Sequence, residues 1–193
     1  MLPLSSPDQS NQKFEGAGFA EADLSDHTFE DCQFLQCDFK GADLTRTRFM
    51  DCTFQSCDFS NAILANGRMR DVRFDSCKLL GLQWVNLEDL MNPSFNECNL
   101  SYANFSGLKL KKTDFYKCSL RDVDFFQADL TGSDLRNSDL LNARFHVTTL
   151  LKADFRGATN YLINPVENKV KGARFTMPEA QGLLAGLGIE LEN

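Results

Sequence analysis

The sequence predicts an all-β solenoid whose coils have four sides, and three observations lead to that prediction. Large apolar residues recur at every fifth position, as in Phe39, Leu44, Phe49 and Phe54. Like residues recur at every twentieth position, and a small residue stands two places before each large one. A five-residue period matches neither a helix nor a flat strand. Each pentad is therefore predicted to form one side of a coil, and four pentads one turn.

The pentad pattern fills most of the 193-residue chain. Its large central residues run from Phe14 to Trp84, slip by one position within 85–90, and resume from Leu90 to Phe155. We expect an N-terminal tail at 1–11, the solenoid at 12–157 and a C-terminal cap at 158–193. The solenoid should have about seven coils, each contacting only its neighbours at a strand spacing of about 4.8 Å.

The small position two places before the centre holds all seven cysteines of the chain. A free cysteine packs as a small hydrophobe, and the spacing of these residues does not match a zinc knuckle. We expect them to be buried, reduced and inert, and they are Cys32, Cys37, Cys52, Cys57, Cys77, Cys98 and Cys118. The two histidines, His27 and His146, lie too far apart along the rod for a shared metal site. The sequence thus predicts no metal, no cofactor and no enzyme.

The segment after the repeats predicts a short helix at about 177–187. Thr176 and Glu179 have the spacing of a capping box, and Pro178 suits a first turn. Ala180, Leu183, Leu184 and Leu187 are spaced to share one helical face, and "IELE" from Ile189 suits a short strand. Because the open end of a solenoid needs a cap, we expect this helix to cover it.

The bulk composition excludes some functions. The chain has 27 Asp and Glu against 20 Lys and Arg, which disfavours binding to nucleic acid phosphates. It has neither the apolar run of a signal peptide nor that of a membrane helix. We expect a cytoplasmic chain that contacts neither membrane nor nucleic acid.

Pentads such as "ADLSD", "ADLTR", "CDFSN", "ANFSG" and "ADFRG" resemble the pentapeptide-repeat family, which implies a right-handed quadrilateral parallel β-helix. The C-terminal element is similar to that of the Qnr, MfpA and microcin-immunity group. That resemblance implies a homodimer joined through Ala180, Leu183, Leu184, Leu187 and Ile189. It also implies a mimic of duplex DNA that binds DNA gyrase or topoisomerase IV, protects or inhibits it, and gives quinolone resistance or immunity to a gyrase-poisoning toxin. The alternative is a structural scaffold of the same fold with another protein partner.

An outward-facing acidic surface would serve such a mimic. The residue just before each centre points outward, and in the C-terminal half this position is mostly aspartate. The candidates for a gyrase-facing surface are Asp114, Asp124, Asp129, Asp134, Asp139 and Asp154. Asp114, Asp134 and Asp154 are twenty residues apart and should form a stripe along one side. The same aspartates could instead serve the fold, by accepting a hydrogen bond from a turn N–H.

Overall fold

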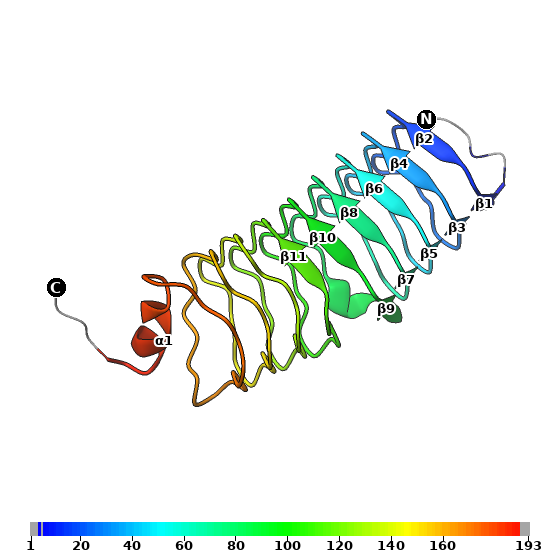
Figure 1. Ribbon diagram of the computed structural model, residues 1–193. Coiled ribbons are helices and arrows are strands. Elements are labelled where there is room, and N and C mark those ends of the chain that lie inside the picture. The colour runs from blue at the N-terminus through cyan, green and yellow to red at the C-terminus, as the bar shows by residue number, and fades with distance from the viewer. Residues whose placement is uncertain (1–3, 5, 190–193) are drawn as a thin grey trace.

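The computed structural model describes residue 4 and residues 6–189, which form a straight rod of stacked coils with the two ends of the chain at opposite ends (Figure 1). Two sides of the rod carry three-residue strands. One side is a parallel five-stranded sheet of β1 (Asp8–Ser10), β3 (Thr28–Glu30), β5 (Arg48–Met50), β7 (Arg68–Arg70) and β9 (Asp89–Met91). The other is a parallel six-stranded sheet of β2 (Lys13–Glu15), β4 (Gln33–Leu35), β6 (Thr53–Gln55), β8 (Arg73–Asp75), β10 (Ser94–Asn96) and β11 (Asp114–Tyr116).

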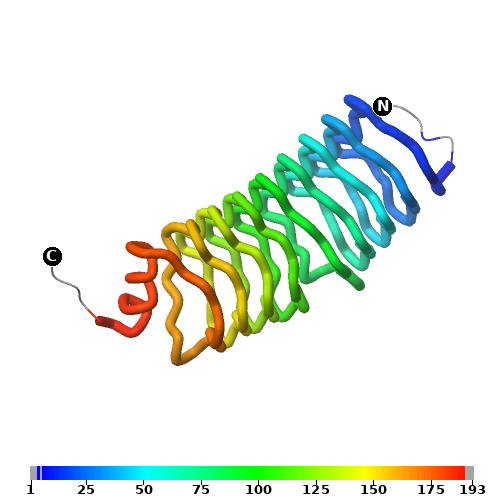
Figure 2. Tube along the Cα trace, in the orientation of Figure 1, coloured from blue at the N-terminus to red at the C-terminus, as the bar shows by residue number. Residues whose placement is uncertain are grey.

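The remaining two sides are held by single parallel bridges between neighbouring coils. One series runs through Gly18, Asp38 and Asp58, and another through Asp23, Asp43 and Ile63. Figure 2 shows that the coils stack at an even pitch along the whole rod. The predicted four-sided all-β solenoid is therefore confirmed.

The register between coils is twenty residues, except at one place. Phe54 lies opposite Phe74, but Phe74 lies opposite Phe95, twenty-one residues on. The extra residue is taken up by a short 3-10 helix at Trp84–Asn86 and by the loop before β9. The register returns to twenty between Phe95 and Phe115, so the one-residue shift stays local.

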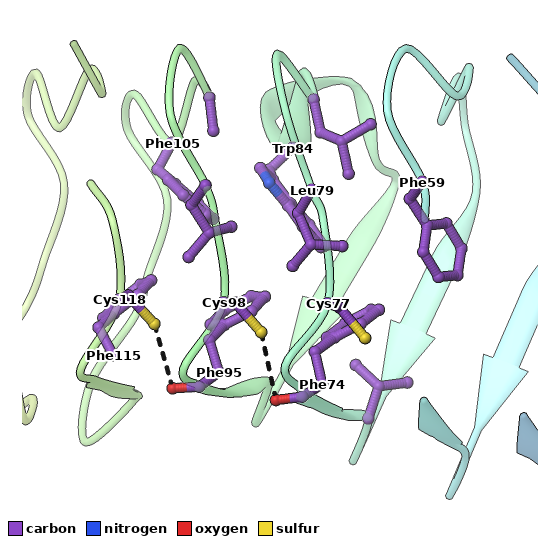
Figure 3. Packing of buried hydrophobic residues seen from close by; sticks show 14 of the residues in the cluster. Phe59, Phe74, Cys77, Leu79, Trp84, Phe95, Cys98, Phe105, Phe115 and Cys118 are labelled. Carbon is purple, nitrogen blue, oxygen red and sulfur yellow. Dashed lines mark hydrogen bonds between the residues drawn. The ribbon is translucent and has the colours of Figure 1, made fainter. Parts of the chain in front are cut away.

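The interior consists of columns of large apolar side chains, in which like residues often stack on one another. The rings of Phe34 and Phe54 stack with centroids 4.8 Å apart, and those of Phe95 and Phe115 are 5.2 Å apart. Figure 3 shows phenylalanines of this kind beside a parallel column of cysteines. All seven cysteines are free and buried, as predicted. Burial is the main cause that raises the pKa of the Cys52 thiol to about 12, so this thiol stays protonated and unreactive at neutral pH.

The coil continues beyond the predicted boundary at residue 157. Thr149 pairs with Lys169, and Asp154 pairs with Arg174, both at the usual twenty-residue register. Phe175 stacks on Phe155 in the interior. The segment 158–175 thus completes one more coil, although its sequence departs from the pentad pattern.

The C-terminal helix α1 spans Gln181–Gly186, so it is shorter than the predicted 177–187. The expected capping box is absent, because the hydroxyl of Thr176 accepts a hydrogen bond from the N–H of Gly157 at 3.0 Å. The N-cap is Ala180, which provides no side-chain cap. Ile189 is in no strand or helix, and most of the predicted "IELE" strand lies outside the described residues.

Two glycines bring α1 against the last coil. A Cβ on Gly182 would collide with the carbonyl oxygen of Tyr161, and one on Gly186 with that of Ile163. Because only a glycine permits this approach, the helix lies directly on the backbone of the coil and covers the end of the core. Leu183, a residue of this helix, packs against that core. The predicted capping role of the helix is therefore seen, with different contacts.

Candidate protein-interaction surface

The structure places the six predicted aspartates on all four sides of the rod. Asp114, Asp134 and Asp154 lie in one ladder, one coil apart from each other. Asp139, Asp124 and Asp129 each lie in a different ladder. The six residues therefore do not form one continuous face.

Five of the six carboxylates brace the turn that follows them. The N–H two residues on donates to Oδ1 of each, at distances such as 2.8 Å in Asp124 and 2.9 Å in Asp134; the others are Asp129, Asp139 and Asp154. Asp23 and Asp43, at the opposite end of the rod, make the same bond. Aspartates before the pentad centre therefore stabilise turns of the fold at both ends of the solenoid.

The same five carboxylates each lie beside a basic side chain. Arg136 contacts Asp134 at 2.6 Å, and Arg156 contacts Asp154 at 2.6 Å. Asp124, Asp129 and Asp139 pair with Arg144, Lys111 and Arg121. The hydrogen bond from Arg156 is the main cause that holds the pKa of Asp154 below its ordinary value. The predicted surface thus has carboxylates whose charge is locally balanced.

Asp114 differs from the other five. Within the described chain it has no ion pair, and desolvation followed by the neighbouring charge of Asp134 raises the pKa of its carboxyl. It is therefore the one member of the six without an ion pair among the described residues.

The excess of acidic residues lies in the N-terminal coils. The aspartates that precede the pentad centres indicate the C-terminal half instead. Residues 1–108 contain sixteen Asp and Glu against eight Lys and Arg, a net charge of −8. Residues 109–157 contain seven Asp against nine Lys and Arg, a net charge of +2. The position before each centre does not reflect this net charge, because the basic residues of the C-terminal half mostly occupy the other outward positions.

Four acids of the first coils form what we call the N-terminal acidic face, made of Glu21, Asp23, Asp38 and Asp43. Asp23 and Asp43 are ladder neighbours, and Asp38 lies on the adjacent side. None of the four makes an ion pair with a described residue, and Lys40 is the base that lies among them in the sequence. This face therefore presents uncompensated negative charge to solvent.

The predicted joining surface at the C-terminal end is divided by the structure. Leu183 turns toward the core and Ala180 is half-buried. Leu184, Leu187 and Ile189 are exposed, with 39%, 41% and 47% of their surface accessible. Of the five predicted residues, these three are placed to contact a second molecule without first undocking the helix.

Two further features bear on function. Among residue 4 and residues 6–189, no group of three or more His, Cys, Asp or Glu is arranged to hold a metal ion. No helix in that same part of the chain has the length and apolar character needed to cross a membrane.

Known proteins share this architecture. The model of the pentapeptide repeat region matches residues 27–88 and 88–155. A structure of trypsin-treated QnrB1, a plasmid-mediated fluoroquinolone resistance protein, is similar at a TM-score of 0.63 and 21% identity, over 96% of this chain and 100% of that chain. A second structure of trypsin-treated QnrB1 gives a TM-score of 0.54 at 22% identity, over 96% of this chain and 92% of that chain.

A weaker similarity joins the chain to HetL, a pentapeptide repeat protein involved in heterocyst differentiation regulation from the cyanobacterium Nostoc sp. strain PCC 7120. Its TM-score is 0.45 at 20% identity, over 89% of this chain and 87% of that chain. No curated protein sequence is similar enough to count as a match. The pentad pattern, the four-sided solenoid and the match of the repeat model over two thirds of the sequence together show that this chain belongs to the pentapeptide-repeat family.

Proposed function

We propose that this protein is a DNA mimic that binds a type II topoisomerase, DNA gyrase in the first instance, and modulates or protects it. Such binding would give resistance to quinolones or immunity to a gyrase-poisoning toxin. The fold it shares with QnrB1, a fluoroquinolone resistance protein, supports this choice of partner. The observation that mainly supports this proposal is the net negative charge of the N-terminal coils of the rod.

The charge density of those coils is comparable with that of a nucleic acid. Residues 1–108 make about five coils, which span about 24 Å at the usual strand spacing. Their net charge of −8 corresponds to about one charge per 3 Å, against about one per 1.7 Å in duplex DNA. A protein surface that binds DNA is basic, and it would attract this half of the rod in the same way.

Two pairs of substitutions distinguish the N-terminal acidic face from the predicted C-terminal stripe. Asp23→Asn with Asp43→Asn removes two charges, and each amide oxygen still accepts the turn hydrogen bond from Ser25 or Thr45. Asp134→Asn with Asp154→Asn makes the same change of net charge at the other end. We expect the first pair to weaken binding to purified gyrase about tenfold at low salt, which is about 1.4 kcal/mol.

Binding should weaken with added salt, and duplex DNA should compete for the same gyrase. If only the second pair weakened binding, the C-terminal stripe would be the contacting face. If neither pair had an effect and DNA did not compete, the protein would act as a scaffold for another partner, and the mimic proposal would be wrong.

We also propose that two copies join end to end through the exposed apolar residues at the C-terminus. Leu184, Leu187 and Ile189 are exposed, and they lie close together because the N–H groups of Leu187 and Ile189 both donate to the carbonyl of Leu184. Leu184→Lys with Leu187→Lys should give a monomer in light scattering while leaving the core contact of Leu183 intact. A dimer that persists in this variant, and that high salt does not dissociate, would rule out the end joint.

A further inference from the structure

One corner of the rod changes the sign of its charge halfway along its length. This corner column consists of the turn residues that occupy the same place in successive coils. All of them have a left-handed backbone, with φ of 52° at Asp71 and 57° at Lys112. In order along the rod the column reads Asn11, Asp31, Asp51, Asp71, Asn92, Lys112, Gly132, Lys152 and Gly172. Its charged members are acidic before Asn92 and basic after it.

In the corner column, charges of opposite sign lie at equal distances on either side of Asn92. Asp71 lies one coil before it and Lys112 one coil after it. Asp31 and Lys152 lie three coils to either side, and Asp51 has the neutral Gly132 as its counterpart. Each acidic position therefore has a basic or neutral position at the same distance beyond the centre.

The adjacent ladder also changes sign at this coil, in the opposite order, from basic to acidic. Ser94 pairs with Arg73 on one side and with Asp114 on the other, so it stands midway between a cation and an anion. The two columns lie side by side on β8, β10 and β11 and on the turns that precede them. The centre of opposite charge is thus the same coil in both columns.

Among residue 4 and residues 6–189, these charges have no ion-pair partner. Elsewhere on the rod, neighbouring coils pair their charges, as Arg46 does with Asp26 at 2.6 Å. Among the described residues, by contrast, no ion pair involves any charged member of the corner column, nor Arg73 or Asp114. Asp71 accepts a hydrogen bond from the side-chain amide of Asn92 at 3.0 Å, which is a contact with a neutral group.

A groove lies over the centre of this region. Its volume is about 690 Å³, and its lining includes Asp71, Arg73, Asn92, Lys112 and Asp114. The groove gives the side chains of an approaching surface room to reach the unpaired charges.

We propose that two copies of this chain associate side by side and antiparallel through the corner column and the adjacent ladder. A two-fold axis at the Asn92 coil places Asp71 opposite Lys112 of the second copy, and Arg73 opposite its Asp114. Asp31 likewise faces Lys152, and every pair occurs twice because the interface is isologous. A parallel arrangement would place each charge against itself, and like charges repel.

The contact is a narrow strip held by charges, so it should be weak and sensitive to salt. It is independent of the proposed topoisomerase binding and of the end joint. In the end joint, Asn92 is about four coils from the contact in each copy, and the two residues are about 40 Å apart at the usual spacing. A cross-link at residue 92 therefore reports on the side-by-side contact alone.

The first test uses Asn92→Cys in the full chain under mild oxidation. The native cysteines are buried, so the introduced thiol is the accessible one, and it faces its own copy across the axis. Asn142→Cys is the matched control, since Asn142 also has a left-handed backbone and donates to an aspartate of the neighbouring coil, Asp122 at 3.1 Å. We expect Asn92→Cys to form covalent dimers at least tenfold faster than the control at low salt.

The second test reverses the charges in the Asn92→Cys chain. Asp71→Lys places two lysines opposite each other and Lys112→Asp places two aspartates opposite each other, so each should slow cross-linking about tenfold. The chain with both changes restores opposite charges and should recover the original rate. Asp122→Lys, a reversal at a similar position on another corner, should have no effect.

The proposal is supported if the double reversal restores cross-linking and 0.5 M salt removes it. It is overturned if Asn92→Cys and Asn142→Cys cross-link equally, or if the double reversal is as slow as the single ones. Circular dichroism on each variant checks that the solenoid remains folded, and both types of side chain already occupy this left-handed position in the wild type.

Discussion

Ser138 joins two coils through a single hydroxyl group. Its Oγ accepts a hydrogen bond from the N–H of Cys118 at 2.9 Å and donates one to the carbonyl of Phe115. Cys118 in turn donates its thiol to the carbonyl of Phe95, as the dashed line in Figure 3 shows. Where the small position of the pentad holds Cys, Ser or Thr, it can therefore supply a hydrogen bond to the preceding coil, in addition to filling space.

Ser138→Ala should destabilise the rod by about 1–3 kcal/mol, because it leaves a buried N–H and a buried carbonyl without this partner. Ser138→Cys should cost less, since cysteine at the equivalent positions donates to the same type of carbonyl. Denaturant unfolding of both variants measures the difference. Equal losses in the two variants would show that a thiol cannot replace the hydrogen bonds of this hydroxyl.

Asp154→Asn should cost about 1 kcal/mol at pH 7, because it removes a charged partner of Arg156 and keeps the acceptor of the turn bond. The folded pKa of Asp154 lies below its unfolded value of 3.8. The stabilising contribution is therefore complete above pH 3.8 and is lost as the pH falls through the folded pKa.

Thermal unfolding of this variant and the wild type across the acid range measures that difference. A double-mutant cycle with Arg156→Gln isolates the contribution of the pair. A coupling of zero at neutral pH, or a cost that does not shrink in acid, would contradict the prediction.

Val147→Asn should stabilise the protein by about 0.5–1 kcal/mol, since the left-handed region disfavours a β-branched residue and tolerates asparagine. Val147 has a φ of 56°. Its side chain is 52% exposed, so little burial is lost, and Asn66 already occupies the equivalent turn of an earlier coil. The melting temperature should rise by about 2–4 °C per kcal/mol.

The control for this substitution is Ile63→Asn. Ile63 is similarly exposed at 51% but lies in a bridge with Asp43, where the backbone is extended. We expect no gain there. A gain in both variants would point to a general surface effect and not to relief of the turn.

Gly186→Ala should undock helix α1 from the last coil, because the added methyl group would meet the backbone of Ile163. Ala185→Ser, on an exposed neighbouring position, should leave the helix in place. Hydrogen exchange across residues 176–189 should accelerate in the first variant and remain unchanged in the second. Unchanged exchange in both would mean that the helix can shift to accommodate the methyl group.

The solenoid, its four sides, the slip and the burial of the cysteines could all be predicted from the sequence. These features follow from a one-dimensional pattern, since a residue at the centre of a pentad has the same surroundings in every coil. The end of the solenoid was harder to predict. The last coil at 158–175 lacks the pattern, and it forms because the preceding coil offers an exposed ladder edge and the stacked ring of Phe155.

The hydrogen bonds and ion pairs that the polar side chains make could be determined only from the stacked coils. Thr176 has the spacing of a helix cap, but the N–H of Gly157 lies within its reach and takes the hydroxyl instead. The aspartates of the predicted stripe are in register, yet Arg136 and Arg156 fold back on them and balance their charge. Burial repeats with the pentad and can be read from it. The pairing of charges depends on how far each side chain reaches across coils, so the corner column of unpaired charges became visible only in three dimensions.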